Sequence, residues 1–388
     1  MGRSVACARR SNVSFRSLSL CSEPRVDCPC IELRSGGLGR IQSPILDSDR
    51  ARSPPMSIRF GLSGSGIADY QLGSGSWEFL RDMCLQAEAQ GFDAYYVADH
   101  LSPVSGRDPH GECIEAWTIL AGLAAVTERI RLGTLVTGAT YRHPAVLAKM
   151  ATMVDIMSGG RLEFGIGTGW SRGDHDPFGI PFPSFGDRVA ALDEQLASTK
   201  LLWTQRDTTF SGQYVSMSGA AHEPKPIQKP HPPILIGGSS DRTLRVAARH
   251  ADIWNGLGTP AYVAERLATL DRLCAEEGRD PAEIRRTWWT PLKLTNDKAE
   301  ANAYVAEQVA AMRATTKVEN LRHRYATSDV SLEENTRSAM LVGTPAQIQK
   351  QIERLLDLGI SGIILHTPPY EPEELERFAR EVAPAFRD

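Results

Sequence analysis

Histidines stand where the predicted strands of this chain end, and they are the residues best suited to proton transfer. His100, His143, His175 and His366 follow four different strands, and Asp99 directly precedes His100. Imidazole changes its charge near neutral pH, so a histidine beside a carboxylate can give or take a proton. Many histidines are only structural hydrogen-bonding groups. We expect His100, together with Asp99, to be catalytic.

The other histidines have competing interpretations. His143 lies in Tyr141-Arg142-His143-Pro144, where it either lines a site or only caps the helix that Pro144 begins. Asp174-His175-Asp176 has the spacing of metal ligands, but three polar residues before Pro177 are more typical of a solvated loop. We therefore predict no metal site.

Two glycine-rich turns could approach a ligand closely. Gly167-Thr168-Gly169 would allow a flat ring to lie against the backbone, or would only permit tight packing of strand and helix. Gly237-Gly238-Ser239-Ser240 precedes a helix, and backbone N–H groups at a helix start bind phosphate well. An ordinary glycine turn with a serine cap is the alternative. Lys293, near the end of a strand, could form a Schiff base or be a solvated charge.

Alternating apolar runs and helical periods predict eight strand–helix units after Met56. The predicted strands are Arg59–Ser63, Asp93–Ala98, Ile130–Thr137, Arg161–Gly167, Ile234–Gly237, Ala251–Asn255, Ile284–Thr295 and Gly362–His366. The predicted helices are Trp77–Gln90, Cys113–Thr127, Pro144–Met157, Asp187–Trp203, Asp241–His250, Pro260–Glu277, Thr344–Leu358 and Glu371–Ala385. A short hairpin at Thr208–Met217 and a polar, mostly helical insertion at 296–340 interrupt the alternation.

This order predicts an α/β fold, a (β/α)8 TIM barrel with insertions, in which the carboxyl ends of the strands line the active site. The competing fold is a doubly wound open sheet. Its dinucleotide fingerprint is missing, because Gly165, Gly167 and Gly169 do not have the GxGxxG spacing.

The first 55 residues differ from the rest of the chain. They contain nine Arg, no Lys, ten Ser and four Cys, without helical or strand periodicity, which predicts disorder. Five acidic residues argue against a transit peptide, and no apolar run suits a signal peptide. Met56 opens a natural first strand, so residues 1–55 could also be a mis-called start, and we expect one domain over residues 56–388.

The net charge and the cysteine content restrict the classes of partner and the cellular compartment that we expect. The whole chain has a net charge of −4, and residues 1–55 carry nine basic and five acidic residues, so the remainder is at about −8. Because this net charge is negative, we expect no nucleic-acid partner. We also expect no membrane span, because no apolar run approaches the ~20 residues that a bilayer requires. Cys84, Cys113 and Cys274 form neither a disulfide pattern nor a zinc pattern, which suits the cytoplasm. Cys28-Pro29-Cys30 could indicate a metal site, but no second pair of metal-binding residues lies nearby in the sequence, so we give this motif little weight.

The chain from about Ser57 to Phe386 resembles the luciferase-like flavin and deazaflavin oxidoreductases, and most closely the branch that uses coenzyme F-420. Six motifs, with a downstream extension of the second, carry this resemblance in order: Val97-Ala98-Asp99-His100, Gly133-Thr134-Leu135-Val136-Thr137 followed by Tyr141-Arg142-His143-Pro144, Ser158-Gly159-Gly160-Arg161, Gly165-Ile166-Gly167-Thr168-Gly169-Trp170, Gly179-Ile180-Pro181-Phe182-Pro183 and Pro232-Pro233-Ile234-Leu235-Ile236-Gly237-Gly238.

The resemblance implies a cofactor at the carboxyl rim and a cis peptide bond between non-proline residues within Leu135–Thr137, where Val136 and Thr137 would contact the ring. Asp99 and His100 would lie beside the deazaflavin. Gly237, Gly238 and Ser239 would hold its phosphate, and Gly167, Thr168 and Gly169 would lie against the ring. Reduced F-420 is a hydride donor that reacts poorly with oxygen, so the expected reaction is hydride transfer to or from a small organic substrate. The resemblance also implies a homodimer.

One departure concerns the substrate. The sugar-phosphate and alcohol dehydrogenases of this family have a glutamate after the glycine-rich loop, where this chain has Trp170. The second proton donor is then unassigned, with Asp174 and His175 as candidates. We expect His143, Trp170, His175 and His366 to line the substrate pocket, together with the loops at 64–76 and 104–112 and the 296–340 insertion.

Three alternatives remain open from the sequence. The first is an FMN-dependent monooxygenase that uses oxygen and a partner flavin reductase. The second is a barrel lyase that uses Lys293, and the third is a deazaflavin carrier without catalytic activity.

Overall fold

The computed structural model describes residues 58–64, 76–103, 108, 110–314, 330–367 and 370–387. The predicted disorder of residues 1–55, the start at Met56 and the Cys28-Pro29-Cys30 motif lie outside these ranges. Most residues of the two loops that we expect to line the pocket, 64–76 and 104–112, also lie outside these ranges.

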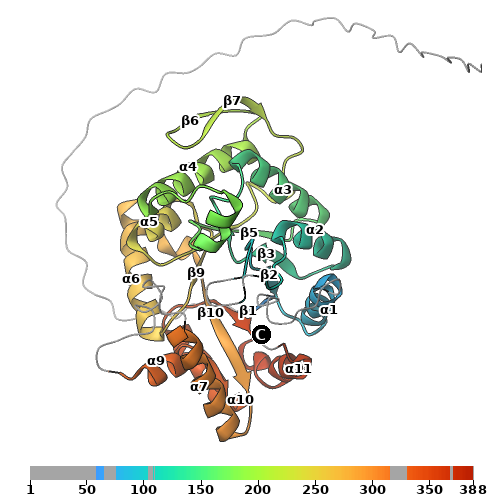
Figure 1. The fold of residues 1–388 in the computed structure, drawn as a ribbon, viewed down its shortest axis with the longest axis vertical. Helices are drawn as coiled ribbons and strands as arrows, with labels where there is room; N and C mark the ends of the chain where they lie inside the picture. The colour runs from blue at the N-terminus through green and yellow to red at the C-terminus, as the bar shows by residue number, and fades with distance from the viewer. Residues whose placement is uncertain are drawn as a thin grey trace, which may run out of the picture. The chain divides into compact units, whose positions relative to one another are not determined.

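Eight parallel strands close into a barrel, as predicted (Figure 1). Each strand pairs with the next along the chain, and the last pairs with the first, with Arg59 beside Gly362. The barrel strands are β1 (Arg59–Ser63), β2 (Ala94–Val97), β3 (Arg131–Thr134), β5 (Leu162–Gly167), β8 (Ile234–Gly237), β9 (Ile253–Gly256), β10 (Arg285–Leu294) and β12 (Gly362–His366).

A helix follows each barrel strand and packs on the outside of the barrel (Figure 1). These helices are α1 (Ser76–Ala89), α2 (Ala116–Val126), α3 (Pro144–Met157), α4 (Phe185–Thr204), α5 (Asp241–His250), α6 (Pro260–Glu276), α10 (Pro345–Asp357) and α11 (Pro372–Glu381). In α3 the residues Leu147, Ala151 and Val154 recur at helical spacing and are buried, and the helix has the predicted bounds.

Several elements interrupt or extend this repeat. The predicted third strand is split into β3 and β4 (Thr137–Gly138), and the peptide bond Leu135–Val136 between them is cis, within the segment where the resemblance implied one. The predicted hairpin is present as β6 (Asp207–Ser211) and β7 (Ser216–Ala221). Short 3-10 helices are η3 (Arg172–Asp174), η4 (Asp176–Phe178), η5 (Pro281–Glu283) and η6 (Ala383–Phe386).

The insertion before α10 is helical, as predicted, in its described part. It contains α7 (Lys298–Ala314) and α9 (Leu332–Ser338), which pack on a small apolar cluster of their own. It also ends in a strand that we did not predict. This strand, β11 (Leu341–Gly343), pairs with the last residues of β10, from Leu292 to Leu294.

Two apolar layers hold the barrel together. The larger layer lies between the strands and the surrounding helices and contains large buried side chains such as Trp117, Phe164 and Trp203. The smaller layer fills the barrel interior, where Tyr96, Leu235 and Ile253 are buried. Within the described ranges, no helix combines the length and apolarity that a membrane span requires.

The amino-terminal end of the barrel is closed by a buried ion cluster around Glu163. Arg131 Nε lies 2.9 Å and Arg285 Nη2 2.5 Å from Glu163 Oε1, and the Tyr96 hydroxyl donates to the same carboxylate. Burial alone would raise the pKa of Glu163, but the charges of Arg285 and Arg131 outweigh it and lower this pKa. The cluster lies at the strand ends opposite to the predicted site.

Replacing Glu163 with Ala should lower the free energy of unfolding by about 3 kcal/mol, because two half-buried arginines, Arg131 and Arg285, lose their buried counter-charge. Chemical denaturation at neutral pH measures this loss, and the exposed Glu376→Ala variant is the control. Since the pKa of Glu163 is lower in the folded state, the difference between wild type and variant should shrink as the pH falls through that pKa. Equal stabilities for Glu163→Ala and the control would contradict this role.

Candidate active site

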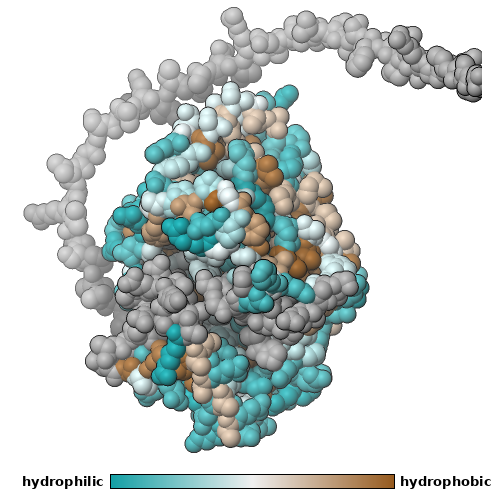
Figure 2. Space-filling model, viewed as in Figure 1, coloured by the Kyte–Doolittle hydropathy of each residue, from teal (hydrophilic) through white to brown (hydrophobic). Residues whose placement is uncertain are grey.

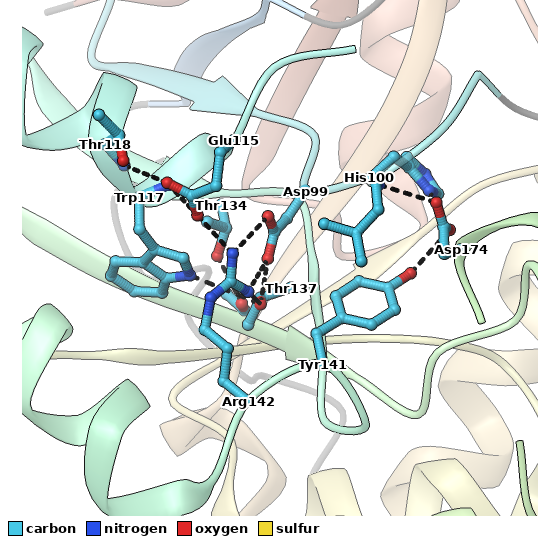
Figure 3. Close-up of polar contacts among 12 residues, drawn as sticks. Asp99, His100, Glu115, Trp117, Thr118, Thr134, Thr137, Tyr141, Arg142 and Asp174 are labelled. Carbon is cyan, nitrogen blue, oxygen red and sulfur yellow. Dashed lines mark hydrogen bonds and ion pairs between the residues drawn. The ribbon is translucent and has the colours of Figure 1, made fainter. Parts of the chain in front are cut away.

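The candidate site lies at the carboxyl ends of β2, β3 and β5 (Figure 3). Val97 ends β2, and Asp99 and His100 follow after Ala98. Parallel strands place their carboxyl ends on one rim, so these residues meet Thr137–Arg142 after β3 and the loop after β5. Although Asp99 and His100 are neighbours in the sequence, their side chains join two different networks.

Asp99 is fully buried and holds the segment that follows the cis peptide bond. Arg142 Nη1 and Nη2 lie 2.6 and 3.1 Å from the two carboxylate oxygens of Asp99, a bidentate ion pair. The Thr137 hydroxyl donates to the same carboxylate, and Arg142 also contacts Glu115. Glu115 in turn caps the start of α2 by accepting backbone N–H groups. Asp99 therefore fixes the position of the backbone between β3 and α3.

His100 lies against a second buried carboxylate, that of Asp174 in η3. The Nδ1 atom of His100 is 2.7 Å from Asp174 Oδ2, and the hydroxyl of Tyr141 donates to the same oxygen over 2.8 Å. The other oxygen, Oδ1, accepts the backbone N–H groups of Leu101 and Ser102. One carboxylate thus joins the loops after β2, β3 and β5 (Figure 3).

The prediction of a solvated loop at Asp174-His175-Asp176 is wrong for its first two residues. Asp174 and His175 are completely buried because the 3-10 helices η3 and η4 turn them inward, and Asp176 alone is exposed. Both ring nitrogens of His175 are engaged: Nε2 lies 2.7 Å from the Thr140 hydroxyl, and Nδ1 lies 2.6 Å from the Ser171 carbonyl oxygen. His175 therefore supports the loop from within.

The remaining pocket candidates differ in their surroundings. Trp170 is 48% exposed, and its ring meets the His100 ring edge-on at 5.8 Å. His366 ends β12 and lies against Trp289, with ring centroids 4.9 Å apart. His143 is exposed and caps α3 by accepting the Ala145 N–H. The structure therefore places Trp170 next to His100. His143 has the helix-capping contact that was one of its two interpretations from the sequence.

Three strand ends form a surface that excludes larger side chains. A Cβ atom on Gly167 would lie 2.9 Å from Val136 Cγ2, and one on Gly237 would lie 3.2 Å from Val136 Cγ1. Val136, Gly167 and Gly237 therefore converge at the barrel mouth. Thr168 and Gly169 follow on the same loop and are half-buried, and Gly169 has a φ of +72°. Val136, Gly167, Thr168 and Gly169 are residues that we expected at the ring of a cofactor, whereas Gly237 was expected at its phosphate.

The turn between β8 and α5 has the features of an anion site. Gly238 has a φ of +132°, Ser240 caps α5, and Ser239 Oγ accepts the Tyr262 hydroxyl over 2.9 Å. Residues 237–240 are half-exposed at the start of a helix, where backbone N–H groups favour an anion. Beside Ser239, the buried Nε atom of Arg266 has no hydrogen-bond partner among the described residues. The turn fits a phosphate group.

Lys293 is not arranged as a nucleophile. Its Nζ atom lies 3.0 Å from Glu300 and 3.3 Å from Glu371. Burial lowers the pKa of Lys293, but Glu300, the nearby Glu374 and Glu371 together outweigh that effect and raise it, so the amine is protonated at neutral pH. This finding opposes the lyase interpretation. In the part of the chain that the structure describes, no group of three or more His, Cys, Asp or Glu side chains could hold a metal ion.

A comparison with known protein families shows to which family this chain belongs. The model of the family described as luciferase-like monooxygenase matches residues 58–362.

The chain belongs to the luciferase-like monooxygenase family.

Members and structural neighbours of this family act on different substrates. The F-420-dependent glucose-6-phosphate dehydrogenase of Kineococcus radiotolerans is 27% identical, over 79% of this chain and 93% of that protein. A pyrimidine monooxygenase of Stutzerimonas stutzeri is 29% identical, over 80% and 90%. The solved F-420-dependent tetrahydromethanopterin reductase of Methanopyrus kandleri superposes with a TM-score of 0.69 at 22% identity, over 85% of this chain and all of that one. That likeness supports the barrel fold.

Sequence reasoning missed the residues that organise the site. Tyr141 and Arg142 lie in a motif that we interpret from the sequence only for His143. Glu115 lies inside the predicted helix Cys113–Thr127, whereas the structure starts this helix at Ala116 and makes Glu115 its cap. Asp174 was considered only as a metal ligand, a loop residue or a proton donor. Its contact with His100 spans 74 residues of sequence, and no local pattern contains it.

Proposed function

We propose that the protein transfers a hydride between coenzyme F-420 and a small organic substrate. The observation that carries this proposal is the His100 imidazole at the carboxyl rim, held by a buried carboxylate, with Trp170 at its edge. The relatives that depend on F-420 support the choice of cofactor. In the described part of the chain, Cys84, Cys113 and Cys274 are free thiols, which agrees with a reducing compartment, and we place the enzyme in the cytoplasm.

The cofactor would contact the surface that the strand ends form. In this proposal Val136, Gly167 and Gly237 lie against the ring, with Thr168 and Gly169 beside it. Gly238 and Ser239 hold the phosphate through the start of α5. Thr137 contributes its backbone, since its hydroxyl is bound to Asp99.

Bound F-420 supplies the hydride chemistry, and the protein supplies orientation and proton transfer. His100 would exchange the proton that accompanies the hydride, at a position next to the expected ring. Asp99 would contribute by keeping Thr137 and Arg142 in place, since its carboxylate is occupied by both. Trp170, which is half-exposed beside His100, would line the substrate side.

The substrate is proposed to differ from glucose 6-phosphate. Trp170 occupies the place after the glycine-rich loop where the resemblance leads us to expect a glutamate in the sugar-phosphate dehydrogenases. An indole cannot act as a general base, and it offers an apolar surface to the substrate. An organic molecule with an apolar portion fits this side chain better than a sugar phosphate.

The alternative function is an FMN-dependent monooxygenase with a partner flavin reductase. The similarity to a pyrimidine monooxygenase favours it. The two functions differ in their use of oxygen, because reduced F-420 donates a hydride without oxygen.

The purified full chain should turn over F-420 at equal rates with and without oxygen. The assay follows the absorbance of oxidised F-420 in a screen of ketones, alcohols, unsaturated carbonyl compounds and glucose 6-phosphate. We expect turnover with an apolar member of the screen and none with glucose 6-phosphate. Oxygen consumption that requires FMN and a reductase would favour the alternative, and F-420 binding without any turnover would favour a carrier.

Replacing His100 with Ala should lower kcat by roughly 10²-fold, the lower end of what general acid–base catalysis contributes. The dissociation constant of F-420 should remain within a few fold, because the imidazole is engaged with Asp174 and the proposed cofactor surface is formed by other residues. Steady-state kinetics and fluorescence titration give the two values. An unchanged kcat would remove His100 from the mechanism.

We also propose that the protein is a homodimer that pairs through the outer face of α3. Val146, Met153 and Met157 are exposed there, and Val126 is exposed on the neighbouring α2. Figure 2 shows apolar side chains on the surface over these helices. Exposed apolar side chains that gather on one face of a helix are typical of an interaction site.

The double variant Val146→Arg, Met153→Arg should sediment as a monomer, while the wild type sediments as a dimer. Two charges introduced into an apolar interface oppose association. An unaltered circular dichroism spectrum would show that the variant remains folded. A wild-type monomer, or a dimer that survives both substitutions, would rule out this interface.

A further inference from the structure

The two oxygens of the Asp174 carboxylate have different roles. Oδ1 accepts the backbone N–H groups of Leu101 and Ser102 at 2.8 and 3.1 Å. Oδ2 accepts the Tyr141 hydroxyl at 2.8 Å and lies 2.7 Å from His100 Nδ1. The carboxylate is completely buried. It can be satisfied only by donors, and the structure provides four.

The Asp174 carboxylate is ionised at neutral pH. Burial works against the ionised form, but the hydrogen bond and charge of His100, the Leu101 N–H and the Tyr141 hydroxyl outweigh it and lower the pKa of Asp174 to about 2. An ionised carboxylate accepts hydrogen bonds and donates none. A neutral imidazole carries one N–H, so the proton of His100 must lie on Nδ1 and the lone pair on Nε2.

We propose that Asp174 is a positioning residue that fixes His100 in its Nδ1–H tautomer and so makes Nε2 the atom that exchanges a proton with the substrate. The tautomer is a property of the protein alone, whereas its use in catalysis rests on the proposed function. When a substrate is oxidised, its C–H bond breaks and the hydride, with both electrons, passes to oxidised F-420. The O–H or N–H bond next to that carbon also breaks, and its proton forms a bond to Nε2. Reduction runs through the same bonds in reverse.

The other groups around His100 carry no competing charge. Cys113 donates its Sγ–H to the His100 carbonyl oxygen at 3.2 Å, and desolvation of the thiol together with the nearby Asp174 and Asp99 carboxylates raises the pKa of Cys113 to about 11. Burial and the neighbouring Asp174 raise the pKa of Tyr141 well above its usual value, so both groups are neutral near pH 7. Asp99 is paired with the Arg142 cation, and Trp170 contributes an uncharged ring edge. Among the described residues, Asp174 therefore supplies the charge in direct contact with the imidazole.

The Asp174→Asn variant tests the proposal because it changes one oxygen into a donor. The amide oxygen can keep the Leu101 and Ser102 N–H groups, while the NH₂ group replaces Oδ2 and donates to Nδ1 of His100. The proton of the neutral imidazole must then move to Nε2. Nitrogen-15 NMR of histidine-labelled full-length protein without cofactor reads this tautomer directly, and the His100→Gln variant identifies the His100 signals.

In the wild type we expect a protonated Nδ1 in the neutral ring, and in Asp174→Asn a protonated Nε2. With F-420 and a substrate, kcat of the variant should fall roughly 10²-fold, with the F-420 dissociation constant within a few fold.

Tyr141→Phe is the matched control, because it removes one hydrogen bond from the same oxygen and keeps the charge. It should retain the Nδ1–H tautomer of His100. A wild-type spectrum with the proton on Nε2 would overturn the proposal, and this measurement does not depend on the folding of any variant. An unchanged tautomer in a folded Asp174→Asn protein would overturn it as well. A switched tautomer in a protein that never turns over F-420 would leave the positioning role intact and refute the proposed function.

Discussion

The candidate site depends on one buried carboxylate. Asp174 connects the loops that leave β2, β3 and β5, because it accepts hydrogen bonds from Leu101 and Ser102 and from Tyr141, and contacts His100. A buried carboxylate without donors would be strongly destabilising, so the loops must come together for the barrel mouth to fold. The same contacts orient the imidazole that we propose as the proton-transfer group. Folding and function therefore share this interaction.

A second buried carboxylate, that of Asp99, has a different role from that of Asp174. Asp99 adjoins His100 in sequence, yet it turns to Arg142 and Thr137 and fixes the backbone that continues from the cis peptide bond. Val136 in that segment contacts the positions where Gly167 and Gly237 lack side chains. One network thus shapes the proposed cofactor surface, and the other sets the proton-transfer group beside it. The ion cluster around Glu163 closes the opposite end of the barrel and leaves the carboxyl rim free for chemistry.

Much of this architecture could be predicted from the sequence. The strand and helix periods predicted the barrel, and α3 has the predicted bounds because proline starts it and two glycines follow it. The predicted strand at Ile130–Thr137 is instead two strands, and β11 was not predicted, because three residues carry too little pattern to be recognised. His100 was found from its position after a strand. Its partner Asp174 was not, because tertiary contacts between distant loops leave no spacing signal, and the inward turn of η3 buries a residue that looks like part of a polar loop.

The central claim is that the surface at the barrel mouth binds a deazaflavin beside His100. Fluorescence titration of the purified full-length protein with oxidised F-420, and in parallel with FMN, tests it most directly. The account predicts tight binding of F-420 that Gly237→Val weakens strongly, because the added side chain would crowd Val136, with weak or no binding of FMN. Tight binding of FMN alone would contradict the account, and His100 would then need a different role.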